Sequence, residues 1–272
     1  MLSRLPAGQF FGHKSKSCDV AGFRLTESVY SPGLRLPLHS HELAKFCFVI
    51  SGDYIETLGQ KTHRRRPLTL TYHPPDTTHG EAHQAIGHHF LVEMNTHWLD
   101  YASEYSVKLD SPVEICDGIP TRIASQLYNE FCNFDSASTL AVQGLMFELL
   151  AETSRRSVNQ PFKQMPRWLK EVTEILQAQF QDSHSLESLA QTAGVHAMHL
   201  ARAFRQFHNC SVGDYIRRLR IEFASQKLSS TNMPLADIAS LAGFADQSHF
   251  SRTFKRYTGM LPTAFRDASR IR

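Results

Sequence analysis

The sequence lacks any apolar segment that could direct it into or across a membrane. Its first residues, MLSRLPAGQFFGHKSKSCD, contain no apolar stretch of the about 7 to 15 residues that a signal peptide needs. No later segment approaches the roughly 18 consecutive apolar residues of a transmembrane helix. We therefore expect a cytoplasmic protein that has no membrane partner.

Paired cysteines and common enzyme motifs are missing as well. The five cysteines are odd in number and include no C-x-x-C pair: Cys18, Cys47, Cys116, Cys132 and Cys210. This pattern argues against a disulfide framework and against a cysteine-based zinc site. The chain has no P-loop, no G-x-G-x-x-G and no G-x-S-x-G motif, so we expect a protein that is not an enzyme.

The composition is that of a globular protein with a basic C-terminal part. With 272 residues, 42% of them hydrophobic, the chain is long enough for two domains that each bury a core. The net charge of +3 conceals an asymmetry, because residues 1–166 carry 15 Lys/Arg against 17 Asp/Glu whereas residues 167–272 carry 14 against 9. A polyanionic partner is therefore expected at the second part.

The N-terminal half changes from a strand pattern to a helix pattern. Up to about residue 100, β-rich runs such as AKFCFVISG and PLTLTYH alternate with turn formers, which predicts an all-β barrel or sandwich. From about Pro120 the apolar residues recur with a helical period, first Ile123, Leu127 and Phe131, then Leu140, Leu145 and Leu149. These two helices would cover the barrel or form a dimer interface.

A linker separates this half from a helical one. The segment TSRRSVNQPFKQMP has two prolines and few apolar residues, which is typical of an interdomain linker. We predict an α+β protein of two domains. Residues 1–156 form the first domain (barrel about 1–100, helices about 120–156), residues 157–166 a linker, and residues 167–272 an all-α domain.

The all-α part contains an internal repeat. The stretch LESLAQTAGVHAMHLARAFRQFHNC, from Leu186, aligns with LADIASLAGFADQSHFSRTFKRYTG, from Leu235. Aligned pairs include Ala190 with Ala239, Gly194 with Gly243, Arg202 with Arg252, and Phe204 with Phe254. Each copy has a helix, a glycine and a second helix, which predicts helix-turn-helix units at about 186–208 and 235–258. Gly194 and Gly243 would supply positive φ at the turns, and Asn209 and Gly259 would cap the second helices.

The second helix of each unit should have a packed face and a DNA-reading face. On a helical wheel, packing Phe250 and Phe254 leaves a polar or basic stripe of Gln247, Ser248, Ser251, Arg252, Lys255 and Arg256. Packing Leu200 and Phe204 leaves Met198, Ala201, Arg202, Arg205 and Gln206 in the first unit. A structural helical bundle is the alternative, but two copies with matched arginines favour DNA binding.

The two units are predicted to read DNA unequally. Arg202 and Arg252 can each make a bidentate contact to guanine, with about 1 to 3 kcal/mol of discrimination, and Gln247 can read adenine. Met198 and Ala201 offer only apolar contact, for instance to a thymine methyl group. The second unit is therefore expected to be the better hydrogen-bonding reader.

Residues 167–272 resemble the DNA-binding domain of the AraC/XylS family of bacterial transcription regulators. The stretch IASLAGFADQSHFSRTFKRYTGMLPTAFR carries that family's Gly-Phe, Ser-x-Phe-x-Arg-x-Phe-Lys and Gly-x-x-Pro elements. The resemblance implies two recognition helices, joined by a helix around 211–229, that enter successive major grooves about 34 Å apart. Met198 and Val212 depart from the family pattern, since members often have a larger aromatic or polar residue at the first position and the second copy has Pro262 at the second.

The N-terminal half is rich in histidine, with ten of the fifteen before residue 100. The spacing of Gly33, His39, His41 and Gly52, followed by Pro74 and His79, resembles the two motifs of the cupin barrel. The resemblance implies a barrel that holds a small molecule or a metal, as AraC-type sensor domains commonly do. We expect the effector site at His39, His41, Lys45 and His79.

A metal site is the alternative use of these histidines. In metal-binding cupins the implied ligands are His39, His41, His79 and a carboxylate where this chain has Lys45, whose ammonium has no lone pair. His83 could complete a transition-metal site with the three histidines. We favour histidines that hydrogen-bond around an organic pocket, with Lys45 as the partner of an anionic ligand.

Other charged and histidine residues are interpreted as ordinary structure. Arg64, Arg65 and Arg66 are expected to form a solvated charge run in a hairpin. We expect His73, His88 and His89 to be strand residues without a ligand role, because nothing pairs with them at a useful spacing.

Together these patterns predict a homodimeric transcription regulator that binds double-stranded DNA and responds to a small-molecule effector. It would contact RNA polymerase if it activates. The alternative is a metal-binding cupin, either a metal sensor or a metal-dependent enzyme, fused to the DNA-binding domain. A third hypothesis is a barrel that serves only to dimerise. The sequence does not specify the effector, the operator or the direction of regulation.

Overall fold

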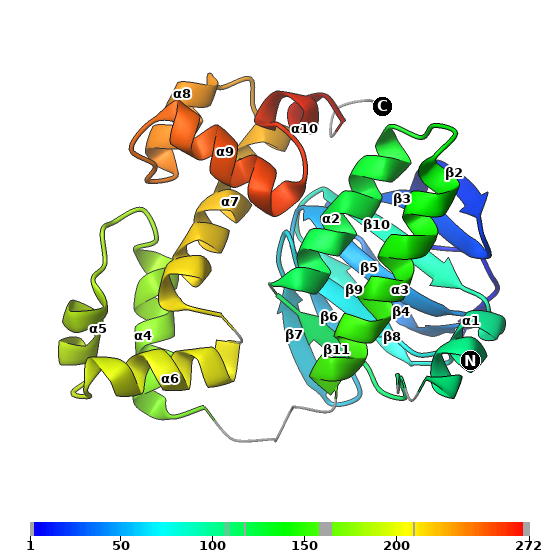
Figure 1. The fold of residues 1–272 in the computed structure, drawn as a ribbon, viewed down its shortest axis with the longest axis horizontal. Coiled ribbons are helices and arrows are strands. Elements are labelled where there is room, and N and C mark those ends of the chain that lie inside the picture. The colour runs from blue at the N-terminus through cyan, green and yellow to red at the C-terminus, as the bar shows by residue number, and fades with distance from the viewer. Residues whose placement is uncertain are drawn as a thin grey trace. The chain divides into compact units, whose positions relative to one another are not determined.

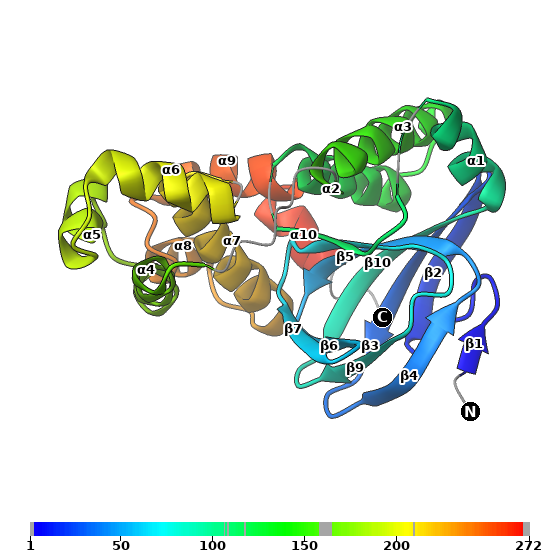
Figure 2. The same ribbon diagram turned by 90° about the horizontal axis from the view of Figure 1, so that it is seen from below.

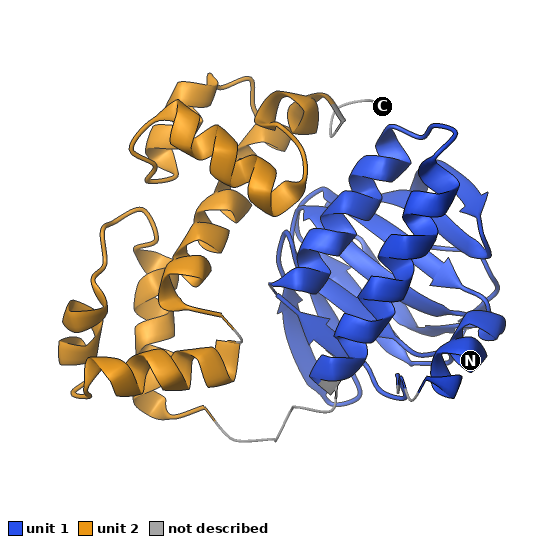
Figure 3. Ribbon diagram, in the orientation of Figure 1, with its two compact units in different colours: residues 1–160, 268–272 blue, residues 161–267 orange. Residues whose placement is uncertain are grey.

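The chain forms two compact units in a computed structural model that describes residues 3–105, 107, 109–116, 118–157, 165–208 and 210–268. Unit 1 comprises residues 1–160 with 268–272, and unit 2 comprises residues 161–267 (Figure 3). Most of the predicted linker, residues 158–164, lies outside the described residues. None of the described helices is long and apolar enough to cross a membrane.

Unit 1 is built on two β-sheets (Figure 1). The five-stranded sheet has the order β1 (Ser3–Leu5), β4 (Arg35–His41), β9 (His79–His83), β6 (Tyr54–Leu58) and β7 (Lys61–Arg65). The six-stranded sheet has the order β11 (Val113–Ile115), β8 (Leu70–His73), β5 (Ala44–Ser51), β10 (Gly87–Met94), β3 (Phe23–Tyr30) and β2 (His13–Val20). The predicted β-rich region over about the first 100 residues is confirmed.

The six-stranded sheet separates an apolar layer from a polar one. Side chains alternate between the two faces of a strand, so Phe46 and Phe48 face away from Lys45 and Cys47 on β5. The apolar face is covered by α2 (Ile119–Cys132) and α3 (Ser138–Ser157), as Figures 1 and 2 show. The ring of Phe90 lies 5.3 Å from that of Phe131 on α2. The polar face is turned towards the other sheet, which places ionisable groups inside the barrel.

Two features of unit 1 differ from the sequence prediction. The helix α1 (Thr96–Glu104) and the strand β11 lie in a stretch for which the sequence predicted neither. Trp98 anchors α1 by donating from its indole nitrogen to the carbonyl of Ala21 at 3.0 Å. Leu140 is 76% exposed, because the face of α3 that packs is formed by Val142, Met146, Leu149 and Leu150. Leu140 was thus wrongly placed on the packed stripe, whereas Ile123, Leu127 and Phe131 are buried as predicted.

Unit 2 is helical, and four of its helices lie in the two copies of the repeat. It contains α4 (Arg167–Ala178), α5 (Leu186–Thr192), α6 (Ala197–His208), α7 (Val212–Ser230), α8 (Leu235–Leu241), α9 (Gln247–Thr258) and α10 (Pro262–Ala268). The pairs α5–α6 and α8–α9 are the two predicted helix-turn-helix units, and α7 is the predicted connecting helix (Figure 1).

Caps and glycines fix the ends of these short helices. The side chains of Ser185, Ser211 and Asp246 accept backbone N–H groups at the starts of α5, α7 and α9. Gly194 and Gly243 have φ of 64° and 78° at the two turns, and Gly259 caps α9 in the left-handed region. Asn209, the predicted cap of α6, lies outside the described residues.

Candidate nucleic-acid interface and ligand site

The two predicted reading helices each have a buried face and a solvent face. Leu200 and Phe204 on α6, and Phe250 and Phe254 on α9, are fully buried. The predicted DNA contacts lie on the other faces. Met198, Arg202, Arg205, Gln206, Gln247, Ser248, Arg252, Lys255 and Arg256 are exposed, and Ala201 and Ser251 are half-buried. Each unit therefore presents one polar or basic helix face to solvent.

The two faces differ in chemistry. Met198 is 68% exposed on α6, which leaves an apolar side chain at the start of that helix where α9 presents polar ones. On α9 the Asp246 side chain accepts the N–H of His249 at 2.7 Å and holds the N-terminal turn. Arg256 lies 3.9 Å from Asp214 on α7, so its charge is partly balanced within the unit.

Arg220 on α7 ties the two helix-turn-helix units together. Its guanidinium donates to the carbonyls of Phe180 and Asp182, at 2.8 and 3.0 Å, and to that of Gln181 at 3.2 Å. It also donates to the carbonyl of Gly243, in the turn of the second unit. The segment before α5 and the turn before α9 are therefore fixed to one side chain. The sequence analysis missed Arg220, because backbone carbonyls carry no residue signature.

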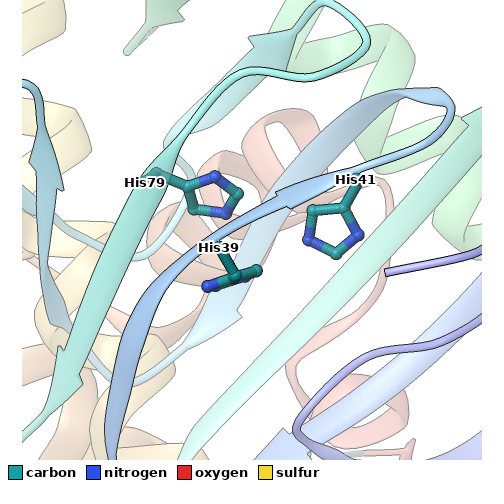
Figure 4. Close-up of side chains that lie close together, drawn as sticks. All are labelled: His39, His41 and His79. Atoms are coloured by element: carbon teal, nitrogen blue, oxygen red, sulfur yellow. The ribbon is translucent and has the colours of Figure 1, made fainter. Parts of the chain in front are cut away.

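In unit 1 the structure brings the predicted effector residues together inside the barrel. His39 and His41 lie on β4 and His79 on the neighbouring β9 (Figure 4). The ring centroids of His39 and His79 are 4.3 Å apart, and those of His41 and His79 are 5.4 Å apart. Lys45 donates from Nζ to Nε2 of His79 at 3.1 Å. All four side chains are buried.

Backbone contacts orient two of these imidazoles. Nδ1 of His79 lies 3.1 Å from the carbonyl of Thr77, and Nδ1 of His39 lies 2.8 Å from that of Pro37. A carbonyl only accepts, so Nδ1 carries the proton in each ring and Nε2 has a lone pair. Burial, with the charge of Lys45, lowers the pKa of His41 to about 2, which keeps that ring neutral at physiological pH.

Two residues that were not predicted belong to the same cluster. Nε2 of His73, on β8, lies 3.1 Å from Oε1 of Glu56, on β6, and its ring stacks on that of His79 at 4.9 Å. Burial alone would raise the pKa of Glu56, but the contact with His73 and the charge of Arg65 hold it well below its usual value. The expectation that nothing pairs with His73 was wrong, because its partners lie on two other strands, Glu56 on β6 and His79 on β9.

His83 does not join the histidine group of the predicted metal site. Its ring stacks on Tyr30 and Tyr54, with centroids 4.4 and 5.0 Å apart, and its Nε2 donates to Glu81 at 2.9 Å. His79 and His83 are four residues apart on one strand. Their side chains therefore lie on the same face, but about 13 Å apart along the strand, which is too far for one metal ion. Of the four predicted ligands, His39, His41 and His79 have ligand atoms within 4.8 Å of one another.

Arg65 is buried, contrary to the prediction of a solvated run. Its side chain is 3% exposed and binds Glu56 through Nε and Nη2, at 2.8 and 2.7 Å from Oε2. Nη1 contacts Glu114 on β11. The neighbouring Arg64 is solvated and pairs with Asp53 at the surface. The alternation of a strand turns only the middle arginine inwards.

The surroundings of Lys45 do not favour an anionic ligand. Its pairing partners across the sheet are Glu93 on β10 and His73 on β8. Burial lowers the pKa of Lys45, and the charges of Glu81, Glu56 and Glu93 oppose that shift. The ammonium is thus already balanced by carboxylates within the barrel.

Comparison with known proteins finds relatives of the helical part. Residues 189–268 match the family described as a helix-turn-helix domain. The probable transcription factor PqrA of Proteus vulgaris is 32% identical over 101 residues, which span 37% of this chain and 79% of PqrA. The transcriptional activator AarP of Providencia stuartii is 40% identical over 82 residues, spanning 30% of this chain and 61% of AarP.

Two further matches cover 31% and 90% of this chain. The arabinose operon regulatory protein of Salmonella typhimurium is 41% identical over 86 residues, 31% of each chain. This chain thus spans less than two thirds of AarP and less than a third of the arabinose regulator. Among solved structures, ToxT from Vibrio cholerae is 9% identical with a TM-score of 0.40, over 90% of this chain and 98% of its own.

Proposed function

This chain belongs to the AraC/XylS family of transcription regulators, and from that premise we propose that α6 and α9 read double-stranded DNA while the barrel binds a small-molecule effector. The DNA-binding proposal rests chiefly on the two matched helices. Each buries an aromatic residue on one side and carries exposed basic residues on the other, with Arg202 and Arg252 at equivalent positions. Such faces fit the major groove.

The two readers contribute differently. Gln247, Ser248 and Arg252 on α9 supply the donors and acceptors that discriminate bases by hydrogen bonds. Met198 on α6 supplies apolar contact, and Arg205 supplies charge towards phosphate. Arg220 holds both helix-turn-helix units against α7, so that α6 and α9 enter successive grooves as one body.

The barrel is the sensor. Its buried cluster of His39, His41, Lys45 and His79 provides polar groups for an effector. We further propose that the domain mediates homodimerisation. The functional domains are residues 1–156 and 167–272, joined by 157–166. The protein acts in the cytoplasm without enzymatic activity, and it contacts RNA polymerase where it activates.

DNA binding should weaken with salt and depend on the basic faces. On DNA upstream of its own or neighbouring genes, the full chain is expected to give a sequence-preferring gel shift at moderate salt. Lys255→Ala should weaken binding evenly across sequences and reduce the slope of log K against log salt by about 1, because one phosphate contact is lost.

The control is Lys170→Ala, which removes an exposed lysine of α4 outside both reading faces and should change neither affinity nor slope. If the full chain shows no sequence preference at moderate salt, the proposal is wrong.

A further inference from the structure

The inside of the barrel holds more carboxylates than cationic side chains. Glu56 and Glu93 are at most 1% exposed, and the side chain of Glu81 is 8% exposed. Lys45 and Arg65 are the buried cations among the described residues of this unit. The negative charge of the three carboxylates lowers the electrostatic cost of binding a further cation inside the barrel.

Glu56 and His73 approach each other without forming a hydrogen bond. Oε1 of Glu56 and Nε2 of His73 lie 3.1 Å apart, yet their orientation satisfies neither atom as donor or acceptor. Both side chains are at least nine-tenths buried. Two ligand atoms on one tetrahedral metal ion, each about 2.0 Å from it, are separated by about 3.3 Å. The observed separation therefore suits two ligands of one ion.

His79 completes the set. The ligand atoms of Glu56, His73 and His79 all lie within 4.8 Å of one another. Nδ1 of His79 donates to the carbonyl of Thr77, which leaves the lone pair of Nε2 for an ion. Metal-binding histidines are commonly held by such a contact at the other nitrogen.

We propose that Glu56, His73 and His79 bind a divalent transition-metal ion inside the barrel. Two imidazoles and one carboxylate suit zinc, iron(II), manganese(II) or cobalt(II). Glu56, on β6, supplies the carboxylate that is missing at position 45. The alternative group of His39, His41 and His79 offers three neutral imidazoles and no negative charge to compensate the ion.

Lys45 sets the affinity of this site. Its Nζ lies 3.1 Å from Nε2 of His79, the same atom that the metal needs. The ion and the ammonium therefore compete for one lone pair, and metal binding moves Lys45 towards Glu81 and Glu93. Removing the ammonium should make the metal bind more tightly.

The test is a titration of the chelator-treated full chain with cobalt(II), followed by its visible absorption bands and by metal analysis. The wild-type chain should bind one equivalent in the barrel. Glu56→Gln and His73→Asn should each weaken binding by at least about tenfold, whereas Lys45→Met should strengthen it. The variant His39→Asn removes a buried histidine of the other group, and it should still bind one equivalent.

Each variant's fold is checked by circular dichroism without metal, and His73→Asn decides the matter if Glu56→Gln fails to fold. No cobalt uptake by the wild-type chain would overturn the assignment. Loss of uptake in His39→Asn with retention in His73→Asn would overturn it too, since the ion would then belong to the other group. DNA binding is measured separately without metal, so the two proposals fail independently.

Discussion

Replacing Arg65 with methionine is expected to lower the free energy of unfolding of the barrel by about 3 to 5 kcal/mol. The guanidinium neutralises the fully buried Glu56 and also binds Glu114, so its removal leaves a buried carboxylate without its cation. The chain has two tryptophans, Trp98 in unit 1 and Trp168 in unit 2. Urea unfolding followed by fluorescence in a Trp168→Phe background therefore reports on the barrel alone.

The neighbouring arginine is the control for this effect. Arg64 has the same charge and pairs with Asp53, but its side chain is 59% exposed. A surface ion pair contributes at most about 1 kcal/mol, so Arg64→Met should cost little. The double variant Arg65→Met with Glu56→Gln should recover part of the loss, because no buried charge then lacks its partner. An equal loss in the free energy of unfolding for Arg65→Met and Arg64→Met would contradict the stabilising role of the buried Arg65.

Gly243→Ala is expected to destabilise unit 2 by about 2 to 5 kcal/mol. A Cβ atom at Gly243 would lie 2.4 Å from the carbonyl oxygen of Gln181, which is backbone and cannot turn aside. Overpacking of this kind costs about 1 to 3 kcal/mol, in addition to about 1 to 2 kcal/mol for a side chain in the left-handed region. Arg220 binds the carbonyls of both Gln181 and Gly243. Any shift at this contact therefore also loosens the link between the two helix-turn-helix units.

Gly194→Ala separates the steric contribution from the conformational one. Gly194 occupies the equivalent turn of the first helix-turn-helix unit with φ of 64°, but a Cβ atom there would meet nothing within 4 Å. Gly194→Ala should therefore lower the free energy of unfolding only through the left-handed backbone conformation, by about 1 to 2 kcal/mol. Unfolding followed through Trp168 in a Trp98→Phe background compares the two variants. If both variants lower the free energy of unfolding by the same amount, the close approach of Gln181 to Gly243 does not contribute to the effect of Gly243→Ala.

The helical half could be predicted from the sequence because its signals are local. Helix periodicity, the caps Ser185 and Asp246, and glycines at both turns lie within a few residues of the features they determine. The repeat then supplied a second, independent copy of each signal.

The barrel interior could be predicted only in part. His39 and His41 share a face because they lie two residues apart on one strand, and this is visible in the sequence. The contact of Glu56 with His73 depends on which strands face each other across the barrel, and no local pattern fixes that. Arg65 is the last residue of β7 and pairs with the buried Tyr54, and the run of three arginines does not show which of them faces the interior.

The inequality of the two DNA readers is tested most directly by a binding scan in which every base pair of the bound site is substituted in turn. The scan compares the full chain with Arg252→Ala and Arg202→Ala. We predict that Arg252→Ala loses about 1 to 3 kcal/mol and all discrimination at one base position, because a bidentate guanine contact disappears. Arg202→Ala should weaken binding by a similar factor at every sequence, because we assign the first unit around Met198 and Arg202 mostly apolar and phosphate contacts, and a phosphate contact carries no base discrimination. Loss of discrimination in Arg202→Ala, with an even effect in Arg252→Ala, would contradict this assignment.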